Sequence, residues 1–513
     1  MLHGLTGSRK SNESDFVVGS GSKYHYNNLW FASKGYMVLS FTARGWHIFN
    51  TSNTSETISR SPCVNFTPQS VDGNPASMYP GPDAACYIQI SHLKYDVADT
   101  QHLIGRLVDG TLTNADGVEA APRKVGVTGI SLGAGQTWLL TRKNEWKSPK
   151  GTLIRIAGAA PIIGWTDIVD ALAPNGRRRD TETSLSLAAR EAEMAGVKND
   201  YVDVFYTGVS SFSTSFGNTT SYLSEWKQEF DAGEPYTGDP VIADAIHKLL
   251  KNRSAWYVKK TTDFDTPIFA VQGMTDGIFW AGQSLRMYNR LNAEREAAGK
   301  ARYPMRLYLG DWGHSPSQNK QAEFQYFARL LNNWFRYHIK GNDIRKPLNT
   351  IEARMTICNG SDGALGPLYR NGNWSLLSGG GLATPVDTSG TPTIHTPADD
   401  PHDDTLIPAD GGRPNPAPGG TKGINGVDDD SCRATDTDTD TDNAQWTSDP
   451  IAGDPVQLLG MPEVTVTVDP QYNEMYVAGR LWDVDYGADV GPDDDTQTLV
   501  TRGVYRIEGA DEG

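Results

Sequence analysis

Cysteine is scarce in this sequence. Only Cys63, Cys86, Cys358 and Cys432 occur among 513 residues. So few cysteines exclude a disulfide-rich scaffold, and their spacings are not those of a zinc site. Cys63 and Cys86 flank one polar loop rich in proline and glycine, so a disulfide across this loop is one interpretation. Four separate buried thiols are the other, and the sequence leaves both open.

Long apolar runs and an excess of basic residues are also missing. No window of about 18 residues is apolar throughout, so we predict no segment that spans a membrane. The chain has 46 lysines and arginines against 62 aspartates and glutamates, a formal net charge of -16. Because this charge repels nucleic acid and anionic lipid, we expect neither as a partner. The first residues also lack the charged leader and apolar stretch of a signal peptide.

Short apolar runs, most of them followed by glycine, aspartate or a turn, recur along the chain. They lie at positions 36–41, 124–128, 153–157, 267–271 and 305–309, and helical patterns such as 96–107 and 281–298 separate most of them. Strands that alternate with helices predict a parallel sheet covered on both faces. Ligands of such sheets gather at the carboxyl ends of the strands.

The pattern then changes in ways that predict further domains, as expected for a chain too long for one core. Helical stretches replace strands between 164 and 262, which predicts a cap over the carboxyl ends of the strands. Proline, glycine, threonine and aspartate dominate 378–445, and the strictly alternating stretches 463–468 and 475–481 predict half-buried strands. We therefore predict an α/β core in two parts, 1–163 and 263–345, a helical cap at 164–262, and an all-β domain at 346–513 that contains the acidic loop 378–445.

Within that loop, threonine and aspartate alternate from 435 to 442. The run lacks the glycine turn and the terminal glutamate of a calcium-binding loop, so we interpret it as solvated coil.

One pentapeptide suggests a nucleophile. Gly129-Ile130-Ser131-Leu132-Gly133 follows the predicted strand at 124–128 and precedes a predicted helix. A serine on such a strand-to-helix turn is held in a strained conformation with its hydroxyl clear of the sheet, and glycines two residues away on either side let strand and helix pass closely. Ser131 is therefore our candidate nucleophile.

A serine nucleophile needs a base, and the base needs an acid that orients it. Among ten histidines, His314 lies just past the predicted strand 305–309 in a glycine-containing turn, whereas His338 falls within an amphipathic helix. Asp276 follows the strand 267–271 in the same way, and Asp311 is a weaker candidate because it is too close in sequence to His314. The order serine, acid, histidine is that of α/β-hydrolases and not that of chymotrypsin or subtilisin.

The oxyanion that forms during acyl transfer needs two N–H donors. One is expected from the residue after the nucleophile, Leu132, and the other from the loop at positions 2–7, where we expect the backbone N–H of Leu5 with Gly4 as its neighbour. We interpret His3 as a residue that orders this loop.

Together these stretches resemble the α/β-hydrolase fold and, within it, the family of X-Pro dipeptidyl-peptidases, cocaine esterase and α-amino-acid ester hydrolases. The resemblance rests on positions 3–7, 30–36, 42–45, 95–101, 129–133, 273–277, 313–314, 334–341, 458–462 and 499–506. It implies that Ser131 attacks an ester or amide carbonyl, His314 transfers the proton and Asp276 orients His314, with no metal and no cofactor. It also implies that the C-terminal domain is a jelly roll with a galactose-binding-like fold.

The sequence departs from the family in two places. Cocaine esterase and its closest relatives supply a tyrosine to the oxyanion hole, whereas Gly4 and Leu5 occupy that region here and favour donors from the backbone alone. The strands expected before His3 are missing, and the β-domain ends early after Glu508. We therefore expect a chain truncated at its N-terminus and leave truncation at the C-terminus open, so the missing leader does not separate an exported protein from a cytoplasmic one.

Three functions remain open on the sequence. The first is an ester or amide hydrolase. The second is an X-Pro dipeptidyl-peptidase, which would need carboxylates in the cap to bind the free amino terminus of a substrate. The cap contains Glu191, Glu193, Glu225 and Glu229, although their positions on solvated helix faces explain them more simply. The third is a carbohydrate-binding protein with a vestigial hydrolase core, against which the intact serine, acid and histidine argue. The acyl specificity and the oligomeric state are not determined by the sequence.

Overall fold

The computed structural model describes much of the chain, with gaps. The described residues are 1–5, 7–17, 21–44, 46, 88–112, 124–174, 197–198, 201–203, 205–206, 221–233, 236, 238–260, 262–314, 317, 319–341, 345–357, 365–379, 434–436, 458–460, 474–485 and 496–508. All four cysteines, including the predicted pair Cys63 and Cys86, and the predicted strand at 463–468 lie outside them.

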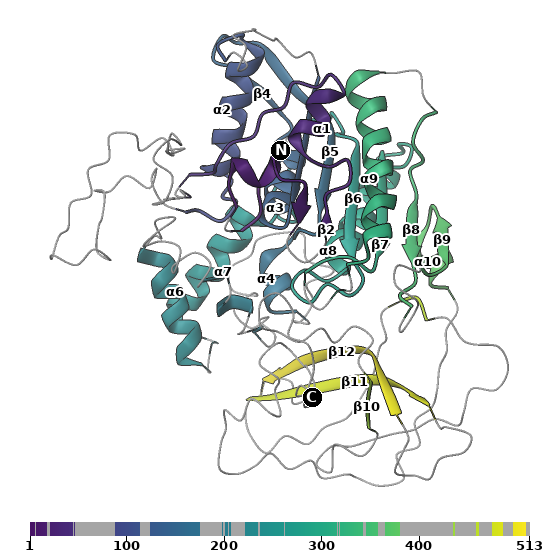
Figure 1. The fold of residues 1–513 in the computed structure, drawn as a ribbon. Coiled ribbons are helices and arrows are strands. Elements are labelled where there is room, and N and C mark those ends of the chain that lie inside the picture. Colours follow the sequence, from purple (N-terminus) through teal and green to yellow (C-terminus); the bar gives the residue numbers. More distant parts are fainter. Residues whose placement is uncertain are drawn as a thin grey trace, which may run out of the picture.

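A seven-stranded sheet, mostly parallel, forms the centre of the described part (Figure 1). The order is β3-β5-β6-β7-β8-β9, and β4 pairs with β5 outside this path. Along the order, β3, β5, β6, β7 and β8 pair in parallel. β4 is antiparallel to β5, and β9 is antiparallel to β8. The bounds are β3 Val125–Ile130, β4 Glu145–Lys147, β5 Leu153–Ile162, β6 Ile268–Gly273, β7 Met305–Gly310, β8 Ile351–Arg354 and β9 Leu368–Asn371. Every residue of β6 and β7 is buried, as expected for inner strands covered on both faces.

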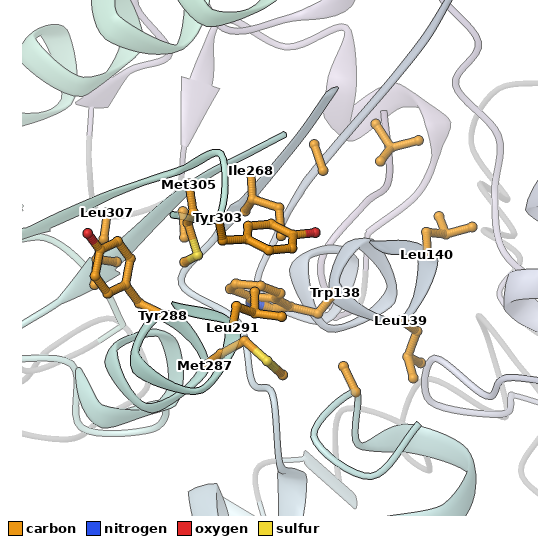
Figure 2. Close-up of a cluster of buried hydrophobic side chains, with 14 of the residues drawn as sticks. Trp138, Leu139, Leu140, Ile268, Met287, Tyr288, Leu291, Tyr303, Met305 and Leu307 are labelled. Atoms are coloured by element: carbon orange, nitrogen blue, oxygen red, sulfur yellow. The ribbon is translucent and has the colours of Figure 1, made fainter. Parts of the chain in front are cut away.

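Helices cover both faces of the sheet. On one face, α2 (Asp96–Val108), α3 (Leu132–Arg142) and α8 (Gly282–Ala297) pack against the strands, and Figure 2 shows Trp138 of α3 among residues of α8 and of the strands. On the other face lie α1 (Asn28–Ser33) and α9 (Gln321–Phe335). Each face has its own cluster of buried apolar side chains, and successive residues of β6 alternate between the two clusters. Ile268 and Ala270 belong to the cluster on the first face, and Phe269 and Val271 belong to the cluster on the second. This alternation is the strand periodicity that makes a three-layer α/β sandwich.

Three described helices lie between β5 and β6 in the sequence: α4 (Ile168–Leu172), α6 (Ser221–Ala232) and α7 (Pro240–Arg253). At the start of α7, Asp239 accepts hydrogen bonds from two backbone N–H groups and Pro240 occupies the first turn, where no N–H partner is needed. Residues of α4, α6 and α7 join Leu132 and Phe279 in a third apolar cluster. The insertion therefore packs against the end of the sheet that carries Ser131.

Near the C-terminus the described strands form a separate three-stranded antiparallel sheet in the order β10-β12-β11. The bounds are β10 Ala434–Asp436, β11 Glu474–Asp485 and β12 Thr496–Glu508. β11 contains the alternating stretch predicted as a strand, and its register with β12 shifts between Leu481 and Trp482.

Two expectations about local structure are wrong. Residues 36–41 form no strand, and Leu39 instead accepts a hydrogen bond from the amino group of Met1. Among the described residues, the partner of β3 on the side away from β5 is Leu2, through an isolated bridge at Gly129. Of the Thr-Asp run, expected as coil, the first two residues belong to β10, which pairs with β12, and the rest of the run lies outside the described residues. In both places long-range pairing decides the outcome, and local composition does not record it.

The remaining short elements are η1 (Arg9–Asn12), β1 (Phe16–Val17), β2 (Gly21–Ser22), η5 (Arg336–Lys340) and α10 (Trp374–Leu377). The amphipathic helix predicted around His338 is thus α9 followed by the π-helical turn η5, and Gly341 ends it in a left-handed conformation (φ 64°).

Candidate active site

Ser131 lies on the turn between β3 and α3 in a strained backbone conformation. Its φ is 56° and its ψ is -119°, a region that residues with a side chain rarely adopt. A β-carbon on Gly129 would lie 2.6 Å from the backbone of Gly133, and one on Gly133 would lie 2.6 Å from the carbonyl oxygen of Leu2. The two glycines of the motif are therefore required by close approach, as predicted.

His314 and Asp276 come together with Ser131 at the carboxyl ends of the strands. Nε2 of His314 lies 2.8 Å from Oγ of Ser131, and Nδ1 of His314 lies 2.9 Å from Oδ2 of Asp276. These distances allow the serine hydroxyl to donate to Nε2 while the Nδ1–H donates to the carboxylate. The arrangement joins a hydroxyl, an imidazole and a carboxylate from three loops that follow β3, β6 and β7.

The carboxylate of Asp276 is fully buried and held from both sides. Oδ1 accepts hydrogen bonds from the backbone N–H groups of Ile278 and Phe279, both at 2.9 Å. Oδ2 accepts from the backbone N–H of His314 at 3.1 Å as well as from its ring. Because the side chain of Asp276 has no exposed surface, these donors replace water and fix the carboxylate in one orientation.

The weaker candidates are placed elsewhere. Asp311 accepts a hydrogen bond from the hydroxyl of Thr275 at 2.7 Å, and the carboxylate bound to the ring of His314 is that of Asp276. His338 lies in η5 with its ring 4.4 Å from that of Trp334, and burial lowers its pKa to about 4. It therefore packs against Trp334.

The loop that contains Gly4 and Leu5 lies beside the nucleophile. A β-carbon on Gly4 would be 3.5 Å from the carbonyl oxygen of Ile130 and 3.7 Å from the β-carbon of Ser131. Among the described residues, no hydrogen-bond acceptor is bound to the backbone N–H of Leu5 or of Leu132.

His3 orders this loop from within. Its Nε2 accepts a hydrogen bond from the backbone N–H of Ala43 at 2.9 Å, so the proton is on Nδ1, which donates to the carbonyl oxygen of Gly4 at 2.8 Å. Burial lowers the pKa of His3 to about 4, so the ring is neutral at pH 7. His3 is thus a buried link between the N-terminal loop and Ala43.

Sequence reasoning missed several residues that support the site. Phe279 is fully buried, and its ring meets that of His314 edge-on at 5.2 Å. Asn319 accepts a hydrogen bond from the backbone N–H of Gly313 at 2.9 Å and so fixes the turn before His314. Phe279 follows Asp276 by three residues, but no pattern in the sequence relates Asn319 to the site.

The cap glutamates are only partly described. Glu191 and Glu193 lie outside the described residues, Glu225 is exposed on α6, and Glu229 on the same helix is half-buried.

No helix among the described residues is long and apolar enough to cross a membrane. No group of three or more histidine, cysteine, aspartate or glutamate side chains in the described part is arranged to hold a metal ion.

A mostly parallel sheet with a serine after β3, an aspartate after β6 and a histidine after β7 defines the α/β-hydrolase fold. Residues 97–316 match the family model of the X-Pro dipeptidyl-peptidase (S15 family). The resemblance predicted from the motifs is confirmed over this range, which includes Ser131, Asp276 and His314.

Several solved structures are similar to this chain. An aminopeptidase from a marine sediment archaeon, Thaumarchaeota archaeon, is 14% identical with a TM-score of 0.30, and the match covers 58% of this chain and 44% of that one. A thermophilic esterase from Thermogutta terrifontis is 12% identical with a TM-score of 0.29, covering 66% and 89%. An esterase from Aspergillus oryzae is 13% identical with a TM-score of 0.29, covering 53% and 69%. No curated protein sequence matches the chain.

Proposed function

We propose that the protein is a serine hydrolase that cleaves an ester or amide through an acyl-enzyme intermediate. The observation that carries this proposal is the hydrogen-bonded chain from Ser131 through His314 to Asp276, with distances of 2.8 and 2.9 Å. These are the distances that proton transfer between a nucleophile, a base and an orienting acid requires.

In the first half of the reaction, Oγ of Ser131 attacks the carbonyl carbon and its proton passes to Nε2 of His314. The tetrahedral oxyanion accepts hydrogen bonds from the backbone N–H groups of Leu132 and Leu5, next to Gly4. The imidazolium then gives its proton to the leaving alkoxide or amine as the bond to the carbonyl carbon breaks. Asp276 stays ionised and stabilises the imidazolium through Nδ1–H.

In the second half, a water molecule takes the place of the leaving group. His314 accepts its proton while the oxygen attacks the acyl-enzyme, and the same proton returns to Oγ of Ser131 when the acid leaves. No step uses a metal or a cofactor.

Two substrate classes fit this chemistry. The match to the X-Pro dipeptidyl-peptidase family favours peptides with a penultimate proline, whereas the exposure of Glu225, one of the carboxylates available to bind a free amino terminus, favours a plain ester. We propose the ester or amide hydrolase as the primary function and the dipeptidyl-peptidase as the second candidate.

The proposed domain organisation follows the same family. Residues 164–262 would form a cap that selects the substrate, and β10, β11 and β12 would belong to a C-terminal jelly roll with a galactose-binding-like fold. Their antiparallel pairing is compatible with that architecture.

A fluorophosphonate probe tests the mechanism, because it reacts with an activated serine. We expect one covalent adduct on Ser131, identified by peptide mapping, and its loss in Ser131→Ala. Folded wild-type protein that stays unlabelled would contradict the enzyme and favour a carbohydrate-binding protein with a vestigial core.

Comparison of p-nitrophenyl acyl esters with Gly-Pro-p-nitroanilide then divides the two substrate classes. We expect ester turnover well above that of the anilide. Rapid release of p-nitroaniline with ester turnover near background would reverse this preference.

A further inference from the structure

Lys198, in the insertion between β5 and β6, is a buried lysine next to the loop of Asp276. The residue is 8% exposed. Its ammonium group donates hydrogen bonds to the carbonyl oxygen of Gly277 at 2.9 Å and to that of Ile278 at 3.2 Å. Removing an ammonium group from water is unfavourable by several kcal/mol unless such partners compensate it, so this contact fixes where the lysine and the loop lie relative to each other.

The two carbonyl groups belong to the same peptide units that bind Asp276. The Gly277–Ile278 peptide offers its carbonyl to Lys198 and its N–H to Oδ1 of Asp276, and the Ile278–Phe279 peptide does the same. In a planar peptide unit the C=O and N–H groups point in opposite directions. Two parallel hydrogen-bonded paths therefore run from the ammonium group through one peptide each to the carboxylate.

Such a path strengthens the bonds along it. A cation at the carbonyl oxygen polarises the peptide and makes its N–H a better donor, an effect that is larger in a low-dielectric environment. The surroundings are apolar, since Tyr201 and Phe205 of the insertion are buried and the ring of Phe205 lies 5.8 Å from that of Phe279. Oδ1 of Asp276 is thereby held, which leaves Oδ2 directed at the ring of His314.

We propose that Lys198 is a positioning residue of the hydrolase, which sets the orientation of Asp276 through the two peptide groups of residues 277–279. The proposal rests on the function proposed above. It means that the insertion does more than cover the site, because its placement on the loop of Asp276 determines how well His314 is aligned as a base. A change at Lys198 should lower kcat by the same factor for every substrate, because Lys198 acts on the base His314 and not on the acyl group.

The test replaces Lys198 with methionine, which keeps much of the length of the side chain and removes its charge and donors. With p-nitrophenyl acetate and p-nitrophenyl butyrate we expect kcat to fall about 10- to 100-fold for both esters, as for a small misalignment of a catalytic group. KM should stay within about threefold. The guanidinium of Lys198→Arg can donate to two carbonyl oxygens. The decrease in log kcat caused by Lys198→Met should therefore be reduced by at least about a third in Lys198→Arg.

Lys227→Met is the matched control. Lys227 also belongs to the insertion, and the two carboxylates with which it pairs, those of Asp203 and Asp231, lie within the insertion as well. We expect kcat to be unchanged within about twofold in this variant. Thermal unfolding of each variant, with assays run well below its midpoint, separates a loss of alignment from a loss of fold.

A double-mutant cycle with Asp276→Ala locates the effect. If Lys198 acts through Asp276, Lys198→Met should slow phosphonylation of Ser131 in the wild-type background and have little further effect in Asp276→Ala. Should Lys198→Met fail to fold, Lys198→Gln, with one amide donor group, takes its place, and its kcat is expected between those of the wild type and Asp276→Ala.

Three results would overturn the proposal: kcat of Lys198→Met within about twofold of the wild type, a loss confined to KM, or additive losses in the double-mutant cycle. Failure of the proposed function is a different result, namely wild-type protein that neither hydrolyses the esters nor reacts with the fluorophosphonate.

Discussion

Gly313 lies so close to Asp276 that a β-carbon on it would be 2.6 Å from the carboxylate oxygen Oδ2. This oxygen is the one that accepts hydrogen bonds from both the backbone and the ring of His314. The absence of a side chain at position 313 therefore allows the turn to bring His314 onto the carboxylate. Loop geometry and catalytic geometry depend on the same atom.

Gly313→Ala should accordingly damage both stability and activity. The new methyl group displaces the carboxylate or the turn, and we expect a loss of about 1–3 kcal/mol in the free energy of unfolding and a fall in kcat of about 100-fold. Urea titration and ester hydrolysis measure the two effects. Gly158→Ala is the control, because a β-carbon there meets its nearest neighbour at an ordinary 3.4 Å; equal damage in both variants would contradict the argument.

Substitution of Ser131 should separate catalysis from strain. Ser131→Ala and Ser131→Gly both remove the nucleophile, and kcat should fall by about 10⁴-fold or more in each. The φ of 56° is unfavourable for serine and alanine but not for glycine. We therefore expect Ser131→Gly to be the more stable variant by about 1 kcal/mol, measured by thermal unfolding. An alanine variant as stable as the glycine variant would show that the turn stores no such strain.

Asp276→Asn and Asp311→Asn should differ sharply. In Asp276→Asn the new amide would present donors to the backbone N–H and the ring of His314, so the ring is expected to adopt the tautomer with its proton on Nε2, which cannot accept the proton of Ser131. A fall in kcat of about 10⁴-fold follows. Asp311 bonds to Thr275 instead, and Asp311→Asn should keep kcat within about tenfold. Steady-state kinetics with one ester compares the two variants, and a reversed order would reassign the acid.

His3 should make the protein less stable as the pH falls. Its folded-state pKa of about 4 lies below the ordinary value of 6.5, so between these values the unfolded chain binds more protons. The stabilisation is present above about pH 6.5 and is lost as the pH falls towards about 4, with a slope of up to about 1.4 kcal/mol per pH unit. Urea unfolding of the wild type and of His3→Gln between about pH 4 and about pH 7 measures the difference in slope.

Comparison with His3→Gln is needed because other groups titrate in the same range. Burial lowers the pKa of His92 to about 3, which acts in the same direction, and raises that of Asp96 to about 7, which acts in the opposite direction. Both remain in the variant, so the difference between the two slopes isolates His3. Parallel slopes for the two proteins would contradict the assignment.

The core of the fold could be predicted because its signals are local. The apolar runs at 124–128, 153–157, 267–271 and 305–309 coincide with strands β3, β5, β6 and β7, since an inner parallel strand is buried on both faces and needs a continuous apolar run. The run at 36–41 has a similar composition, yet it forms no strand. Pairing with a neighbour decides that outcome, and composition does not encode the neighbour.

The residues of the candidate site were predictable for a related reason. Ser131, Asp276 and His314 each follow a strand of a parallel sheet, and the carboxyl ends of such strands lie at one edge. The motif around Ser131 and the order of the three residues therefore suffice to nominate them. The residues that hold them in place, Phe279, Asn319 and Lys198, carry no comparable signal because their roles arise from contacts that depend on how the loops and the insertion fold together.

The sequence by itself determined the α/β architecture, the strained serine turn and the three residues expected to act together, because each of these depends on local periodicity or on the steric needs of glycine. Only the tertiary structure decided how the carboxylate of Asp276 is held against the ring of His314, and that Lys198 bonds the loop of Asp276. Those choices depend on distances of about 3 Å between groups tens of residues apart, and hydrogen bonds are too short-ranged and directional to be read from spacing alone.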